Sequence, residues 1–128
     1  MFLSFSSQEE RRAYGGSDFV EIQFCTLPVG TKPADAVRLK NLRSWEDSSL
    51  YVADDHAFFE EYQAVFTGGY YANGEKGTMD LTGVNYYPAA MLEGIIAKVR
   101  ALAPKDWETL AAWLEKAKEY NGFYIFGL

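Results

Sequence analysis

Two helical stripes of apolar residues follow one another in the last third of the chain, and this pattern constrains the fold more than any other. Pro88 suits a first helical turn, and the first stripe after it consists of Met91, Leu92, Ile95, Ile96, Val99 and Leu102. Pro104 interrupts the pattern. The second stripe consists of Trp107, Leu110, Ala111, Leu114 and Ala117. Gly122 is placed to end the second helix. We therefore expect two amphipathic helices that form a hairpin.

Two aromatic residues of the second helix do not belong to its main stripe. Trp113 and Tyr120 fall about 100° away from it at the ideal helical pitch. We expect them to be half-buried residues on the flank of the helix, and the alternative is an external contact patch.

Strands are predicted where side chains alternate with a period of two. The segment 19–25 alternates apolar and polar residues, which indicates an antiparallel strand with one solvent-facing side. The segment 123–128 is apolar on both sides, which indicates an interior strand that ties down the end of the chain. Shorter strand patterns lie at 2–5 and 50–53. A further alternation starts at Thr78, and a bulge at Gly83 would restore its phase.

Capping residues place two more helices. Ser7 and Glu10 have capping-box spacing for a short helix that ends near Gly15 and Gly16. Asp54 or Asp55 can cap a helix over 56–66, and Gly68 and Gly69 are expected to end that helix.

Two segments between these elements need separate treatment. Asn73 and Gly74 form a strong hairpin signal, because both turn positions tolerate positive φ. The segment 34–45 is ambiguous, since it alternates like a strand but holds no helix breaker up to Leu42; we favour a strand. Together the patterns predict a single α+β domain spanning 1–128. It should be a mostly antiparallel sheet with the C-terminal two-helix hairpin packed on one face and a C-terminal interior strand.

Composition sets limits on function. The chain has 128 residues, 48% of them apolar, and a net charge of -6, which argues against a broad nucleic-acid surface. We expect no membrane span and no signal peptide, because charges break every apolar stretch early. A single cysteine, Cys25, fits a reducing compartment, so a cytoplasmic location is expected.

The negative charge and the aromatic rings coincide in one window. No Lys or Arg occurs from Ser44 to Glu75, where the acidic residues are Glu46, Asp47, Asp54, Asp55, Glu60, Glu61 and Glu75. The same window holds Trp45, Tyr51, Phe58, Phe59, Tyr62, Phe66, Tyr70 and Tyr71. Either the rings face the core and the acids form a solvated rim, or the window forms an acidic, aromatic-anchored surface for a basic partner.

Catalytic and metal-binding machinery is sparse. His56 is the only histidine, so any Ser/His or Cys/His site would have to use it, and Cys25 reads as a small core residue. One Cys and one His cannot supply the four ligands of structural zinc. Phosphate-loop motifs are absent. We therefore expect no cofactor, no bound metal and no enzymatic activity. A carboxylate metal site or a glycosidase-type carboxylate pair stays an alternative.

The chain resembles, in type, the immunity proteins of bacterial polymorphic-toxin and contact-dependent inhibition systems. The resemblance rests on the small size, the acidic segment from Trp45 to Glu75, and the stretches Gly83–Tyr87, Trp113–Ala117 and Asn121–Ile125. It implies an antitoxin that binds a cognate, basic protein toxin and occludes its active site.

The partner-binding residues predicted for that function are Trp45, Asp54, Asp55, Glu60, Glu61, Tyr70 and Tyr71. The acids would pair with Lys or Arg of the toxin, and the two tyrosines would pack at the centre. The alternative is a small enzyme or ligand-binding domain with a pocket lined by tyrosines and carboxylates near Tyr70, Tyr71 and Glu60. A third possibility is a subunit that uses Trp113 and Tyr120 as a contact.

Overall fold

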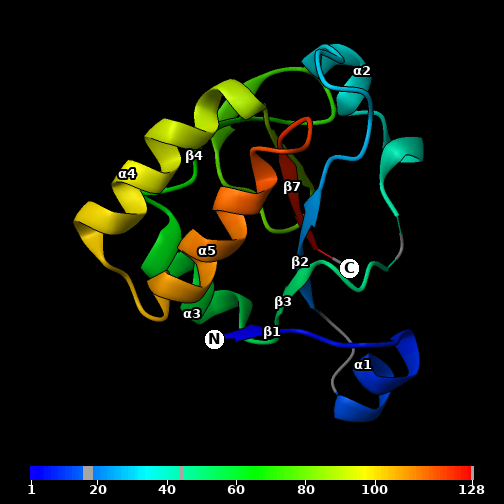
Figure 1. Cartoon of the computed structure of the whole chain (residues 1–128), viewed down its shortest axis with the longest axis vertical. Helices are drawn as coiled ribbons and strands as arrows, with labels where there is room; N and C mark the ends of the chain where they lie inside the picture. The colour runs from blue at the N-terminus through cyan, green and yellow to red at the C-terminus, as the bar shows by residue number, and fades with distance from the viewer. Residues whose placement is uncertain (16–18, 44, 128) are drawn as a thin grey trace.

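The computed structural model describes residues 1–15, 19–43 and 45–127, and its centre is one antiparallel sheet (Figure 1). The strands lie in the order β1-β3-β2-β7-β6-β4-β5. Their bounds are Phe2–Leu3 (β1), Val20–Phe24 (β2), Leu50–Val52 (β3), Thr67–Tyr70 (β4), Lys76–Thr78 (β5), Val84–Tyr87 (β6) and Phe123–Gly127 (β7). The helices are Gln8–Tyr14 (α1), Pro33–Ala36 (α2), Leu39–Asn41 (η1), Asp55–Tyr62 (α3), Ala89–Met91 (η2), Leu92–Leu102 (α4) and Trp107–Ala117 (α5). The α+β class and the mostly antiparallel sheet are confirmed.

The first face of the sheet carries the main core. Alternate residues of the central strands, such as Ile22 and Ile125, are fully buried there against the predicted stripes of α4 and α5. Helix α3 adds Phe58 and Tyr62 to the same core. The helix hairpin therefore covers one face of the sheet, as the two stripes predict (Figure 1).

The second face is buried too, by short and irregular segments. Tyr86 and Tyr124 pack there with Ala36 of α2, and Tyr51 packs with Phe5 near α1. Glu21 of β2 is completely buried on this side, so the solvent-facing side predicted for segment 19–25 is wrong. The reason is that loops from outside the strand pattern cover this face.

Strand β7 lies in the interior of the sheet, between β2 and β6, as its apolar composition predicts. It pairs with β2 from Val20 opposite Gly127 to Phe24 opposite Phe123. Residue 128 of the predicted strand lies outside the described residues.

The described part of the segment 34–45, which lacks residue 44, is not the predicted strand but holds α2 and η1. Pro33 occupies the first turn of α2, and the Asn41 side chain donates a 2.7 Å hydrogen bond to the Asp35 carbonyl oxygen. Val37 is buried while Leu39 is 65% exposed, so these residues do not share a face as a strand would require. Both edges of β2 are already paired with β3 and β7.

Three other expectations need adjustment. Helix α3 ends at Tyr62, earlier than predicted, and residues 63–66 form hydrogen-bonded turns. Gly68 and Gly69 do not end that helix but lie within β4, where a Cβ atom on Gly69 would come within 2.7 Å of the Tyr87 ring. Gly83 is not a bulge, because it ends a turn that starts at Asp80; the register shift is in β4.

The N-terminal helix and the hairpin turn agree with the prediction. The Ser7 hydroxyl accepts a hydrogen bond from the Glu10 backbone N–H at the start of α1, and Gly15 follows its end, whereas Gly16 lies outside the described residues. Gly74 has φ of 85° between β4 and β5. Among the described residues, no helix combines the length and apolar character needed to cross a membrane.

Candidate functional site

The four acidic residues predicted as partner-binding all lie on or beside α3 and are exposed. Asp54 caps the helix, because its Oδ1 accepts a 3.0 Å hydrogen bond from the Ala57 backbone N–H. Glu60 lies one helical turn after His56, with 3.1 Å between Oε1 and Nε2. These positions leave the carboxylates facing solvent while the aromatic side of α3 packs into the core.

A second acidic segment meets α3 at the connection between α4 and α5. The Glu61 Oε1 accepts a 2.7 Å hydrogen bond from the Lys105 backbone N–H, and the Tyr62 hydroxyl donates a 2.7 Å bond to the Lys105 carbonyl oxygen. This link brings Asp106 and Glu108 to α3. We call the resulting surface the acidic corner, and it consists of Asp54, Asp55, Glu60, Glu61, Asp106 and Glu108.

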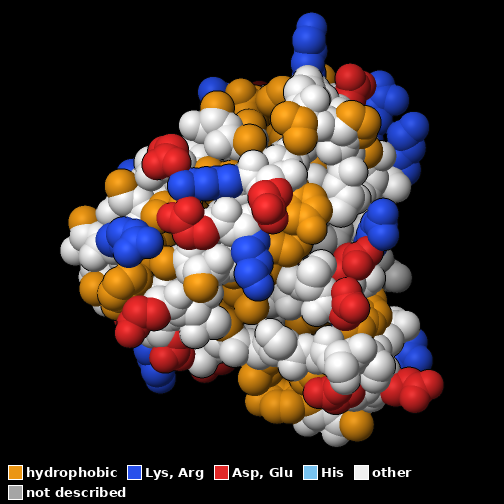
Figure 2. Space-filling view, in the orientation of Figure 1, with side chains coloured by type: hydrophobic (Ala, Val, Ile, Leu, Met, Phe, Trp, Pro, Cys, Tyr) orange, Lys and Arg blue, Asp and Glu red, His pale blue; other side chains and the backbone are white. Residues whose placement is uncertain are grey.

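The pKa of the Tyr62 hydroxyl reflects the proximity of these acids. Burial raises the pKa of the Tyr62 hydroxyl, and three carboxylates raise it further, those of Asp106, Glu61 and Glu108. Besides the contact of Glu60 with His56, one ion pair lies within this surface, since Asp106 Oδ2 lies 2.7 Å from the N-terminal amine of Met1. Figure 2 shows acidic side chains at this corner, and Lys and Arg side chains gathered around α2 at the opposite end of the molecule.

The three predicted aromatic residues lie away from the acidic corner. Trp45 is half-buried and packs against Tyr51, with 6.0 Å between ring centroids, on the second face of the sheet. Tyr70 is half-buried beside Tyr86 on that same face. The Tyr71 hydroxyl donates to the Thr78 carbonyl oxygen across the β4–β5 hairpin. The structure therefore groups the acids and separates them from the rings that were expected to anchor the partner.

The structure does not bring Glu60 together with Tyr70, as the pocket proposed around Tyr70, Tyr71 and Glu60 would require. Glu60 lies on α3, on the helix side of the sheet, whereas Tyr70 packs on the other side. A hollow of about 300 Å³ does adjoin Tyr71, but its lining comes from the hairpin and the turn before β6: Tyr71, Ala72, Asn73, Asp80, Gly83 and Val84.

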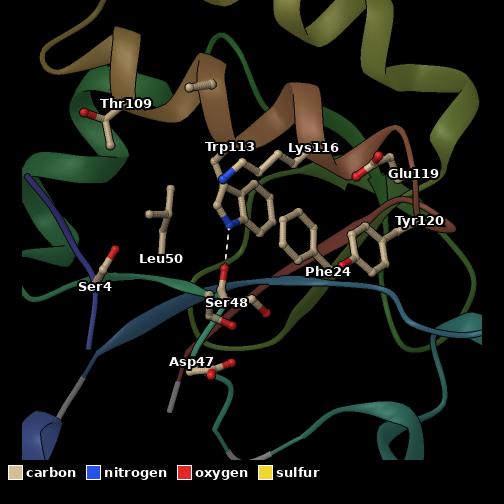
Figure 3. A pocket seen from close by; sticks show the side chains of 12 residues that line it. Ser4, Phe24, Asp47, Ser48, Leu50, Thr109, Trp113, Lys116, Glu119 and Tyr120 are labelled. Carbon is tan, nitrogen blue, oxygen red and sulfur yellow. Dashed lines mark hydrogen bonds between the residues drawn. The ribbon is translucent and has the colours of Figure 1, made fainter. Parts of the chain in front are cut away.

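A further concave feature runs along α5, and sequence reasoning did not predict it. It is a half-open groove of about 440 Å³ between α5 and the segment that leads into β3. We call it the α5 groove, and its lining is Ser4, Phe24, Asp47, Ser48, Ser49, Leu50, Thr109, Ala112, Trp113, Lys116, Glu119 and Tyr120. Figure 3 shows the α5 side chains on one side and Ser4, Asp47 and Ser48 on the other.

Three stacked rings form one wall of the α5 groove. Phe24 lies between Trp113 and Tyr120, with centroid distances of 4.1 and 4.4 Å and interplanar angles of 4° and 10°. The Trp113 indole N–H donates a 2.8 Å hydrogen bond to the Ser48 carbonyl oxygen (Figure 3). Tyr120 is half-buried, as predicted, whereas Trp113 is 7% exposed and belongs to the core, so it is more deeply buried than predicted.

Charged groups on the rim of the groove are free of ion pairs with the described residues. Asp47, Lys116 and Glu119 line the groove, and none of them is within ion-pair distance of an opposite charge. In contrast, the outer side of the helix hairpin carries a network in which Lys118 contacts Glu93 and Glu115. The rim charges are therefore available to a partner.

Comparisons with protein-family models, with curated proteins and with solved structures give no match to this chain.

The candidate catalytic residues from the sequence are not assembled into a reactive centre. Cys25 is fully buried, with Sγ 3.2 Å from the Tyr124 hydroxyl, on the second face of the sheet. His56 is exposed at the start of α3. Among the described residues, no three His, Cys, Asp or Glu side chains are grouped to hold a metal ion.

Glu21 is the one buried acid in the described part of the chain. Burial raises its pKa, whereas hydrogen bonds from Ser49 and Gln23 and the charge of Arg11 lower it. Both hydrogen bonds reach Oε2, at 2.7 and 2.8 Å. Because the Ser49 hydroxyl belongs to the segment that lines the α5 groove, this contact helps to position that segment.

Proposed function

We propose that this chain is an inhibitor of the immunity-protein type that binds a basic toxin protein through its acidic corner. The observation that carries the proposal is the contact of Glu61 with Lys105, which joins two acidic segments into one exposed surface. Six carboxylates lie there, against the Lys105 ammonium and an N-terminal amine that Asp106 already pairs.

Charge of this kind acts first on the rate of encounter. A field of one sign on an exposed corner steers an oppositely charged protein, and salt screens that attraction. Occlusion of a basic active site in the cytoplasm needs no cofactor from the inhibitor. The proposal keeps the four predicted acids and adds Asp106 and Glu108, which the sequence separates from α3 by more than forty positions.

The test uses the protein encoded directly upstream of this chain in its genome. We expect its C-terminal domain to arrest growth when expressed alone, and expect co-expression of this chain to restore growth. The purified pair should associate at least about tenfold more slowly at low salt when the inhibitor carries Asp55→Lys with Glu60→Lys.

The matched control reverses two acids outside the corner. Glu9→Lys with Glu75→Lys changes the net charge by the same amount, but places the change on α1 and on the β4–β5 hairpin. The control should retain most of the association rate. Equal rates for both double variants, or an upstream protein without toxicity, would refute the proposed function.

A further inference from the structure

We propose that the α5 groove binds an extended segment of the partner protein that places one apolar side chain against Ala112 and a Lys or Arg beside Asp47 or Glu119. This inference rests on the proposed function, because it assigns the groove to the same partner. The groove has the volume of ordinary ligand pockets and is open along one side, which suits a chain segment that enters and leaves.

Ala112 creates the space for the apolar side chain. It lies on α5 between Thr109 and Lys116, one turn away from each, and it is exposed although Trp113 beside it is buried. Leu50 lines the groove from the opposite side. The small Ala112 side chain leaves more room than the larger Thr109 and Lys116 side chains on either side of it, and Trp113 and Leu50 supply apolar surface to the same groove (Figure 3).

The aromatic stack favours an aliphatic group over a flat ring. Both faces of Phe24 are covered, one by Trp113 and the other by Tyr120. The Trp113 ring also meets the edge of Phe123, with centroids 5.9 Å apart and planes at 87°. Sugars and nucleobases bind aromatic residues through exposed ring faces. Because Phe24 is covered on both faces and Trp113 is only 7% exposed, little open ring face is left at this part of the groove, and aliphatic contact fits better.

The polar rim suits a peptide backbone. Hydroxyl groups of Ser4, Ser48 and Thr109 line the groove, and none has a hydrogen-bond partner among the described residues. Hydroxyls both donate and accept, as the alternating N–H and C=O groups of an extended chain require.

The charged residues on the rim of the groove favour particular partner side chains on either side of the apolar one. Two unpaired carboxylates, Asp47 and Glu119, stand on the rim against one ammonium, that of Lys116. One lining residue of the groove, Thr109, directly follows Glu108 of the acidic corner along α5. A toxin that docks a basic surface on the corner would therefore direct an adjacent basic segment along the groove.

The test uses full-length protein and short peptide probes. The probe is acetyl-Gly-Lys-Leu-Lys-Gly-amide, with versions in which Glu replaces both Lys residues or Ala replaces Leu. Binding is measured by NMR from the Trp113 indole N–H resonance, assigned with the Trp45→Phe and Trp107→Phe variants. We expect a saturable shift with the Lys-Leu-Lys probe, and affinities lower by about fivefold or more for both altered probes.

Two variants locate the binding. Ala112→Trp fills the space left by Ala112 in the groove from an exposed position, and Ala97→Trp places the same ring on an exposed position of α4. Ala112→Trp should weaken probe binding at least about tenfold, whereas Ala97→Trp should not change it. Lack of a saturable shift with any probe, equal binding of the Lys and Glu probes, or normal binding by Ala112→Trp would overturn the inference.

The experiments distinguish a failure of this inference from a failure of the proposed function. If toxin association depends on Asp55 and Glu60 but the groove binds no probe, the proposed function stands and the assignment of the groove falls. If Asp55→Lys with Glu60→Lys leaves toxin association unchanged, the proposed function falls. In that case, probe binding that Ala112→Trp abolishes would still show the groove to be a peptide site, for a different partner.

Discussion

The indole of Trp113 on α5 is hydrogen-bonded to the carbonyl oxygen of Ser48, a residue 65 positions earlier in the chain, at 2.8 Å. The bond connects the C-terminal helix hairpin to the segment that precedes β3. It fixes the width of the α5 groove, because Trp113 and Ser48 belong to its opposite walls. The stacking of Trp113 on Phe24 holds the ring in the same orientation.

Two substitutions of Trp113 distinguish the contribution of its hydrogen bond to Ser48 from the contribution of its packing on Phe24. Trp113→Phe keeps an aromatic ring on Phe24 but leaves the Ser48 carbonyl oxygen without its donor, so the free energy of unfolding should fall by about 1 to 2 kcal/mol. Trp113→Ala should lower it by about 3 to 5 kcal/mol. Urea unfolding measures both. Trp107→Phe is the control; equal losses for the two Phe variants would contradict the role of the Ser48 bond.

Gly122 is predicted to tolerate no side chain. Its φ is 84°, and a Cβ atom would lie 2.1 Å from the Tyr87 carbonyl oxygen. Gly74 has a similar φ of 85° but open space around it, so Gly74→Ala measures backbone strain alone, about 1 to 2 kcal/mol. We expect Gly122→Ala to lower the free energy of unfolding at least twice as much. Equal losses in urea unfolding would show that the close approach to Tyr87 is unimportant.

Local periodicity was sufficient to predict the C-terminal helix hairpin and the last strand. Burial of α4, α5 and β7 follows from patterns of residues that are close together in the sequence, namely two helical stripes and one apolar run. The placement of the helices on the sheet and of the strand within it could therefore be predicted. The segment 34–45 could not, because its fate depends on β2, whose two edges are taken by β3 and β7. The residues of such a segment carry no sequence pattern that shows how strands elsewhere in the chain are paired.

The candidate site was predictable only in part, for the same reason. The acids of α3 are adjacent in sequence and could be proposed together, whereas Asp106 and Glu108 join them through the contact of Glu61 with Lys105. The α5 groove needs Phe24 of β2 against α5, a contact across nearly ninety positions. The displacement of Trp113 from the main stripe of its helix was the one available signal.

Glu21 should make stability depend on pH. Because its pKa is raised in the folded protein, the unfolded chain loses the proton at lower pH than the folded one. The contribution of Glu21 to stability is therefore full below its unfolded pKa and is lost as pH rises through the folded pKa. We expect Glu21→Gln to become progressively more stable relative to the natural protein over that range.

Urea unfolding of both proteins between about pH 4 and pH 8 measures this difference. Glu75→Gln, at an exposed position on the β4–β5 hairpin, controls for the loss of one negative charge. If Glu21→Gln instead becomes less stable relative to the natural protein as pH rises, the Arg11 charge and the hydrogen bonds outweigh burial.

Buried tyrosines should make the protein unfold in alkali. Burial raises the pKa of Tyr51 to about 12, and it raises the pKa values of four others, Tyr62, Tyr86, Tyr87 and Tyr124. In the unfolded chain these hydroxyls ionise near pH 10, so above pH 10 the free energy of unfolding should fall by about 1.4 kcal/mol per pH unit for each tyrosine.

After a jump to pH 11.5, absorbance at 295 nm should show a slow phase from these five residues that coincides with loss of circular dichroism. In urea at the same pH the slow phase should vanish. Ionisation of all nine tyrosines before the circular dichroism changes would contradict their burial.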